Sequence, residues 1–331
     1  MISRTTAAIA GAVLLLLTSL PGCGKSSAPD ENGKSASVSK QNAAAAEHDA
    51  AQNPASRRRL SVIATYSILG DWVNQVGAEH IRLTTLVGPG GDAHTYEPTP
   101  RDTAAVADAD IVFENGLGFE GWLDRLYSAG NSRATRVIVT EGIQERVFYD
   151  SHGNRETDPH VWHDPQLSLE MVQRVAAALI RADPAHADDY RKNADACISE
   201  LEELMTWMQS QITKLPRSRR KLVTTHDTFG YFAERFGFEL SSVMGTVSSE
   251  AADPSAARIA AIIEAIRREQ VPAIFAENIL NPQMTEQVAR EAGVRVVPTL
   301  FTDALGEEGS GGESYLQMMR SNVTKIVESL K

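Results

Sequence analysis

The chain has 331 residues, of which 42% are hydrophobic, so it is long enough and apolar enough for two domains with buried cores. Its 43 acidic residues outnumber its 32 Lys and Arg residues, which gives a formal net charge of -11. Because nucleic-acid binding needs a basic surface, this charge argues against a DNA or RNA partner.

Residues 1–22 have the pattern of a bacterial lipoprotein signal peptide. Arg4 precedes an apolar run over residues 7–17, and this run is shorter than the roughly 20 residues that span a bilayer. The run leads into Leu20-Pro21-Gly22-Cys23, which resembles the lipobox whose cysteine thiol forms a thioether to lipid. We therefore expect Cys23 to anchor the protein to a bacterial membrane on the extracytoplasmic side, in the periplasm or at the cell surface. A short anchor that is never cleaved is the alternative.

Residues 23–59 are predicted to form a disordered tether. They are rich in Ala, Ser, Lys, Gln and Asn and contain almost no large apolar side chains. Such a segment cannot bury enough surface to offset the entropy lost on folding.

Residues 60–184 are predicted to form a first α/β lobe. The β-rich runs SVIATY, IRLTTLV, DIVFENG and RVIVT alternate with segments of helical length. Alternating strands and helices indicate a parallel sheet with helices on its faces.

A long helix over residues 185–215 is predicted to follow, bounded by Asp183-Pro184 and Pro216. About 28 helical residues would extend ~42 Å, enough to connect two domains. The strand–helix alternation then resumes over residues 216–331. The predicted fold class is therefore α/β, with two parallel-sheet lobes joined by one long, rigid backbone helix.

Several polar residues follow predicted strands, where ligands bind in parallel α/β sheets. A single histidine at such a place is more often structural than functional, but here there are three. Three histidines and one acid suit a four-coordinate transition-metal site, and the residues alone leave open which acid takes part. The candidates are His94, His160, His226, Glu277 and Asp303.

Four segments carry a close resemblance to a known family. DAHTYEPTPRD, DPHVWHDP, TTHDTFGYFAERFGF and LFTDALG are similar to the ligand-bearing segments of the TroA-like solute-binding lipoproteins of zinc and manganese ABC importers. VSSEAADPS resembles a Ser/Thr-Glu-Ala-Glu-Pro-Ser stretch of that family, and NGLGFEGWLDRL looks closest to its AztC-type zinc-binding branch. The resemblance covers nearly all of residues 60–331, with the motifs in the same order.

The resemblance implies metal ligands at His94, His160, His226 and Asp303, in a cleft between the two lobes. It also implies that the chain is not an enzyme. We expect a monomeric extracytoplasmic solute-binding protein that captures a divalent metal ion and delivers it to the membrane permease of an ABC importer.

Two further residues are predicted to support the site without binding the metal. His163 lies three residues after His160, a spacing that permits both to bind one ion, but relatives commonly lack a histidine there. Glu250 in the VSSEAADPS stretch is interpreted as a partner of a ligand imidazole.

The donor set favours zinc. Imidazole nitrogen prefers the later divalent metals, and manganese-type relatives typically place a carboxylate where His226 stands. We therefore expect Zn²⁺, with Mn²⁺ as the alternative. A metal-dependent hydrolase, with Glu277, Glu250 or Asp227 as general base, is a weaker alternative because no HExxH pattern is present. A metal-binding adhesin is another.

The lipobox generates a first prediction. The Cys23→Ala variant should move from the membrane to the soluble extracytoplasmic or secreted fraction, because lipid would be its only firm attachment. Cell fractionation followed by a high-salt wash measures this. A variant that stays in the washed membrane would contradict lipid anchoring.

Overall fold

The computed structural model describes residues 58–149, 153–249 and 254–331. The signal peptide, Cys23 and nearly all of the tether therefore lie outside the described residues, as does Glu250. In the described part, no helix is long and apolar enough to cross a membrane.

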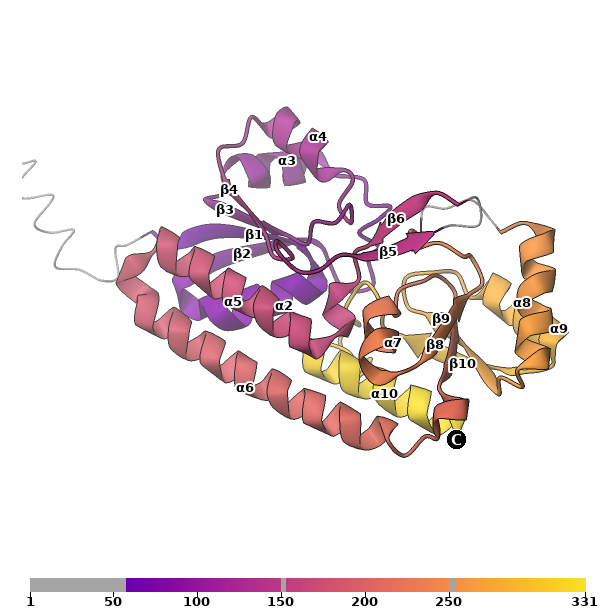
Figure 1. The fold of residues 1–331 in the computed structure, drawn as a ribbon. Helices are drawn as coiled ribbons and strands as arrows, with labels where there is room; N and C mark the ends of the chain where they lie inside the picture. The colour runs from indigo at the N-terminus through magenta and orange to yellow at the C-terminus, as the bar shows by residue number, and fades with distance from the viewer. Residues whose placement is uncertain (1–57, 150–152, 250–253) are drawn as a thin grey trace, which may run out of the picture. The chain divides into compact units, whose positions relative to one another are not determined.

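The first half of the described chain is built on a four-stranded parallel sheet. Its strands are β1 (Leu60–Tyr66), β2 (Ile81–Val87), β3 (Ile111–Glu114) and β4 (Thr135–Ile138), in the order β2-β1-β3-β4. The inner strand β1 is buried along almost its whole length, and its sequence LSVIATY is accordingly apolar at most positions rather than alternating with charged residues. Figure 1 shows this sheet in indigo to violet.

Helices connect the consecutive strands of this sheet, because parallel strands need a crossover connection. Helix α2 (Ser67–Gly77) follows β1 directly and packs on β1 and β2. Helices α3 (Pro100–Ala107) and α4 (Leu123–Gly130) pack against each other. The side chain of Thr99 caps α3, and Asp102 completes a capping box with it.

The second half repeats the pattern with shorter strands. The strands β7 (Lys221–Thr224) and β8 (Glu239–Ser242) pair in parallel, as do β9 (Ala273–Glu277) and β10 (Arg295–Leu300), and β7 lies against β9. These observations confirm the α/β class with parallel sheets. The helices between these strands are α7 (Gly230–Phe236), α8 (Ala256–Arg268) and α9 (Gln283–Ala292).

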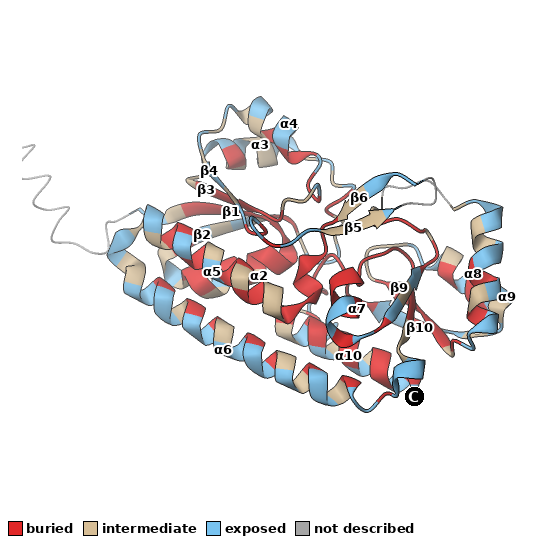
Figure 2. Cartoon of the chain, viewed as in Figure 1, coloured by how far each residue is buried: buried red, intermediate tan, exposed pale blue. Residues whose placement is uncertain are grey.

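The long helix α6 (Ala187–Ile212) contacts elements of both halves. It begins after the short 3₁₀ turn η4 (Pro184–His186). It packs on α2, on α5 (Pro165–Ala182) and on α10 (Tyr315–Leu330), and Figure 1 shows it running beneath α5 and α10. Figure 2 shows a buried stripe along its inner face, formed at helical spacing by Tyr190, Ala194, Cys197, Leu201, Leu204, Met208 and Ile212.

The larger hydrophobic core extends across both halves. It joins Val62 and Phe113 of the first sheet to Leu204 of α6 and to Phe275 and Leu300 of the second half. A smaller core lies between α8, α9 and their strands. The lobe boundaries at residues 184 and 216 stay predictions, but α6 and this shared core tie the elements on either side together.

One element was not expected from the sequence. The stretch before His160 forms an antiparallel hairpin of β5 (Arg146–Tyr149) and β6 (Arg155–Asp158). Its strands are only four residues long, and β6 consists entirely of polar and charged residues, so no periodic pattern of apolar side chains marked the hairpin. The hairpin pairs Arg146 with Asp158 directly across the strands.

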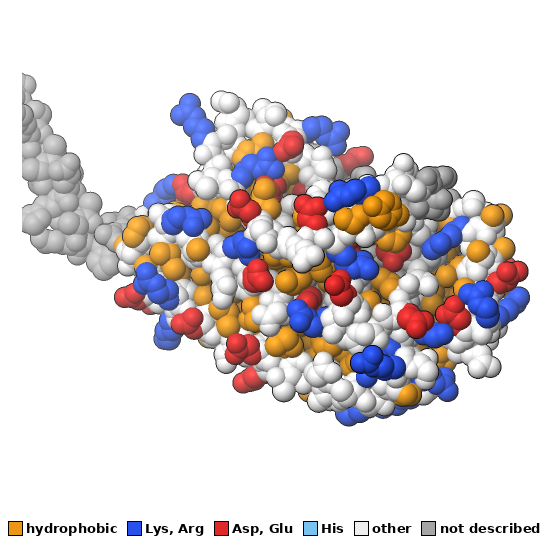
Figure 3. Space-filling view, viewed as in Figure 1, with side chains coloured by type: hydrophobic (Ala, Val, Ile, Leu, Met, Phe, Trp, Pro, Cys, Tyr) orange, Lys and Arg blue, Asp and Glu red, His pale blue; other side chains and the backbone are white. Residues whose placement is uncertain are grey.

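The surface drawn in Figure 3 carries Lys and Arg interspersed with Asp and Glu. Among the described residues on this face, neither sign forms a continuous block. A mixed surface of this kind does not provide the basic footprint that nucleic acid needs.

The buried stripe of α6 generates a stability prediction. Leu204 is fully buried, so Leu204→Ala should lower the free energy of unfolding by about 2–5 kcal/mol through the lost burial and the cavity left behind. Urea denaturation followed by circular dichroism measures the loss. Its matched control is Glu203→Ala, on the exposed face of the same turn, which should stay within ±0.5 kcal/mol of the parent. Similar losses in the two variants would contradict the packing of α6.

Candidate metal site

Four side chains that are far apart in the sequence meet at the strand ends. His94 follows β2, His160 follows β6, His226 follows β7 and Asp303 follows β10. One ligand atom from each lies within 4.8 Å of all the others. The structure thus brings together the three histidines and Asp303, the acid that the family resemblance implied.

Asp303 lies among the three imidazoles. Its Oδ2 is 3.2 Å from Nε2 of His226 and 3.4 Å from Nε2 of His94, and its Oδ1 is 3.7 Å from Nε2 of His160. The Nε2 atoms of His94 and His160 are 3.3 Å apart. Each histidine therefore presents the same ring nitrogen to a common point.

Two carboxylates fix which nitrogen faces that point. Nδ1 of His160 lies 2.8 Å from Oδ1 of Asp158, and Nδ1 of His226 lies 2.5 Å from Oε2 of Glu277. A carboxylate at Nδ1 holds the proton on that atom and leaves the lone pair of Nε2 free for a metal. Glu277, which the sequence left open as a ligand, therefore orients the candidate ligand His226 instead.

The other oxygen of Glu277 is also engaged. Its Oε1 accepts hydrogen bonds from the backbone N–H groups of Thr225, at 2.7 Å, and His226, at 2.9 Å. With both oxygens committed to the β7 end, this carboxylate is not placed to act as the general base considered from the sequence.

The imidazoles and the carboxylates strongly perturb one another. Burial disfavours the charged form of His226, but the carboxylates of Glu277 and Asp303 outweigh it and raise its pKa well above the ordinary value. Burial likewise opposes charge on His160, whose pKa is nevertheless raised by Asp303 and Asp158. The pKa of Asp303 would rise through burial, but His226 and His160 hold it well below its usual range.

Two buried polar atoms at the centre have no hydrogen-bond partner. They are Nε2 of His226 and Oδ2 of Asp303, which lie 3.2 Å apart without the alignment of a hydrogen bond. Leaving such atoms unsatisfied is costly in a protein interior. A divalent cation bound between them would satisfy both, so the donor set fits a transition metal.

His163 lies beside the site but outside the four-residue group. Its Nε2 is 3.3 Å from Oγ1 of Thr228, and that hydroxyl donates to Oδ1 of Asp303 at 3.1 Å. Burial and the nearby His160 charge lower the pKa of His163 to about 3, so it stays neutral. It reaches Asp303 through Thr228, a residue that sequence reasoning missed because a threonine after a strand carries no distinctive signal.

His94 is held through its backbone and its ring. Its N–H donates to Oδ1 of Asp92 at 2.9 Å, and Nε1 of Trp122 donates to the carbonyl of the preceding Ala93 at 2.8 Å. The ring of Phe119 meets the imidazole edge-on, with centroids 4.7 Å apart. The NGLGFEGW segment therefore shapes the site as well as carrying the family resemblance.

Asp303 is fixed by the packing of its glycine-rich segment. The N–H of Leu305 donates to Oγ of Ser67 at 2.9 Å, at the start of α2. A Cβ at either Gly306 or Gly312 would press into the ring of Phe301, so these glycines permit a close approach. Asp303 itself is fully buried.

Of the four candidate ligands, only His94 has any surface exposed to solvent. A cavity of about 290 Å³ is lined by His94 and Phe119 from one side and by Glu156 and Val247 from the other. His160, His226 and Asp303 are 0% exposed, whereas His94 is 8% exposed. His94 is therefore the ligand nearest to solvent.

Comparisons with known proteins agree with this geometry. The chain matches the family described as "Zinc-uptake complex component A periplasmic" over residues 62–329. It is 34% identical over 271 residues to the manganese-binding lipoprotein MntA of Halalkalibacterium halodurans, covering 82% of this chain and 88% of that protein. It is 30% identical over 325 residues to the manganese-binding lipoprotein MntA of Bacillus subtilis, covering 97% and 98%.

A solved structure shares the fold at a similar level of identity. The periplasmic zinc binding protein TroA from Treponema pallidum superposes with a TM-score of 0.77 at 29% identity, covering 83% of this chain and 99% of that chain. The specific likeness to the AztC-type branch stays a prediction.

The raised pKa values generate a prediction for the metal-free protein. His160 and His226 bind protons more tightly when folded, so their contribution to stability is fully present below about pH 6.5 and is lost as the pH rises through their folded pKa values. The free energy of unfolding from urea titrations should therefore fall as the pH rises above about 6.5. The fall should be smaller in His226→Gln. Equal slopes in parent and variant would contradict the coupling.

Proposed function

We propose that this chain carries a single zinc ion as its cargo. The chain belongs to the family of periplasmic zinc-uptake components, matched over residues 62–329. It is a solute-binding component of a metal importer. His94, His160, His226 and Asp303 would bind this ion. The observation that carries the proposal is the convergence of three Nε2 atoms and one carboxylate within 4.8 Å.

The donor set supports zinc over manganese. Three neutral imidazoles and one carboxylate complete the tetrahedral shell that Zn²⁺ prefers. Affinity at nitrogen donors rises from Mn²⁺ toward the later metals. Two carboxylates already orient two of these imidazoles, those of His160 and His226, which raises the basicity of these two as ligands.

Manganese is the second candidate because of the relatives. Both curated relatives described above are named manganese-binding lipoproteins, whereas the solved structure is named a zinc binding protein. The names of these three relatives thus divide between manganese and zinc. We prefer zinc because the candidate site of this chain has three nitrogen donors.

We propose delivery to the permease of an ABC importer from a lipid-anchored position. Cys23 would carry the lipid, on the extracytoplasmic side of the membrane, and the protein would act as a monomer. The relatives named lipoproteins support this location. Because His94 is the ligand nearest to solvent, we propose that the ion enters and leaves on its side.

The transport role replaces the hydrolase alternative. The family is a component of metal uptake, and four candidate ligands leave no open position for the water that a catalytic zinc site keeps.

Metal binding is the direct test. The metal-free full-length protein should take up one equivalent of Zn²⁺ in a calorimetric titration, and excess Mn²⁺ should displace it poorly. His226→Ala should weaken zinc binding by more than about 100-fold, since even partners outside the ligand set cost about 10- to 100-fold.

The matched control is His80→Ala. His80 pairs with Asp189 away from the site, so its loss should leave zinc affinity within twofold or so of the parent. Tighter binding of Mn²⁺ than Zn²⁺ would overturn the choice of metal. Unchanged zinc affinity in His226→Ala would overturn the site.

A further inference from the structure

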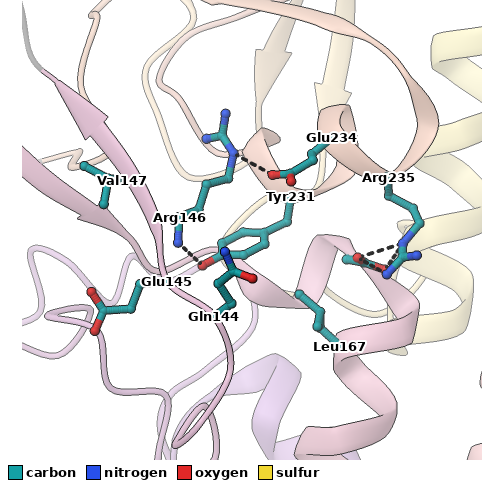
Figure 4. Close-up of a pocket in the computed structure, with 9 residues that line it drawn as sticks. Gln144, Glu145, Arg146, Val147, Leu167, Tyr231, Glu234 and Arg235 are labelled. Carbon is teal, nitrogen blue, oxygen red and sulfur yellow. Dashed lines mark hydrogen bonds and ion pairs between the residues drawn. The ribbon is translucent and has the colours of Figure 1, made fainter.

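A large cavity among the described residues lies outside the metal site. It has a volume of about 590 Å³ and is lined by the start of the β5–β6 hairpin and by side chains of α5 and α7. None of the four candidate ligands lines it. Figure 4 shows Arg146 in its wall, beside Tyr231 and Glu234.

Arg146 connects this cavity to a metal ligand through one carboxylate. Its Nη1 lies 3.1 Å from Oδ2 of Asp158, while Oδ1 of the same carboxylate lies 2.8 Å from Nδ1 of His160. The N–H of His160 also donates to Oδ1, at 3.0 Å. The two oxygens of Asp158 are therefore divided between the guanidinium and the imidazole.

Helix α7 holds this arrangement from the other side. The backbone N–H of Arg146 donates to the hydroxyl of Tyr231 at 3.0 Å, and that hydroxyl donates to the carbonyl of Asp158 at 3.3 Å. The first residue of the helix is Gly230, where a Cβ would overlap Nη1 of Arg146 and Oδ2 of Asp158. The ion pair thus fills the space that a missing side chain leaves.

The carboxylates around the site need positive counter-charge, and Arg146 supplies part of it. Three carboxylates contact the ligand imidazoles: Asp303, Asp158 and Glu277. One guanidinium and one divalent cation together neutralise them. Asp158 is fully buried whereas Arg146 is 31% exposed, and a buried carboxylate without a counter-charge is strongly unfavourable.

We propose that Arg146 is a positioning residue for metal binding, which holds Asp158 so that this carboxylate orients the His160 imidazole toward the ion. This role rests on the proposed function, because it acts on a ligand of that site. It links the metal to the hairpin and to α7, two elements that are separate in the sequence.

The direction in which metal affinity changes when Arg146 is removed distinguishes a positioning role from a purely electrostatic one. Removing a cation near a metal site should by itself strengthen binding of a divalent ion, since repulsion is lost. Removing a positioning residue should weaken it, since the Asp158 carboxylate is freed to turn away from His160.

The experiment compares zinc affinities of full-length variants by competition with a chelating dye. Arg146→Gln should bind zinc about 10-fold more weakly, within the range for partners outside the ligand set. Arg146→Lys keeps the charge and should recover most of the loss. The visible absorption of bound Co²⁺ should change in Arg146→Gln, because a turned imidazole alters the ligand geometry.

Two further variants make the test specific. Arg155→Gln is the matched control, because Arg155 lies on the same hairpin and, among the described residues, pairs with the exposed Glu145 at 3.4 Å. Its affinity should stay within about twofold of the parent. Gly230→Ala should weaken binding by pushing the ion pair apart. Its effect should not add to that of Arg146→Gln, since both disrupt one contact.

The outcomes separate this role from the proposed function. Zinc binding by Arg146→Gln that equals or exceeds the parent, with an unchanged Co²⁺ spectrum, would overturn the role of Arg146. A parent chain that takes up no zinc would overturn the proposed function itself. If circular dichroism shows Arg146→Gln unfolded, Gly230→Ala decides: parent affinity in that variant would overturn the role.

Discussion

Asp303 is a fully buried carboxylate whose oxygens lie between 3.2 and 3.7 Å from three imidazole nitrogens. A carboxylate in that position must be compensated, either by protons on the imidazoles or by a cation that replaces them. The competition between proton and metal follows from this one constraint. It explains why the pKa of His226 is raised and that of Asp303 lowered, and why the site suits a divalent ion.

The surrounding contacts keep the four side chains in place. Asp158 and Glu277 orient two imidazoles, Thr228 donates to Asp303, and Asp92 accepts from the backbone of His94. Each partner is hydrogen-bonded elsewhere or buried, so the four candidate ligands are held in place without an ion. Preorganisation lowers the entropy lost on binding, and here it depends on packing between segments from both halves of the chain.

The fold supplies that packing through α6 and the shared core. Helix α6 contacts α2 and α5 of the first half and α10 of the second half. Helix α2 also provides Ser67, which holds the segment after Asp303. The strand ends that carry His94 and Asp303 are therefore joined by direct contacts as well as by the site. A continuous core of this kind opposes wide separation of its parts, because separation would expose buried apolar surface.

The sequence by itself determined the α/β class, the long helix, and the strand ends at which His94 and His226 lie, whereas the strand before His160 was not expected. These follow from local periodicity, which each segment expresses regardless of its partners, and the family motifs added Asp303. Tertiary structure alone decided that Glu277 orients His226, that His163 reaches Asp303 through Thr228, and that a hairpin brings Arg146 to Asp158. Such contacts join side chains through the packing of whole elements, and no local pattern encodes which side chains will meet.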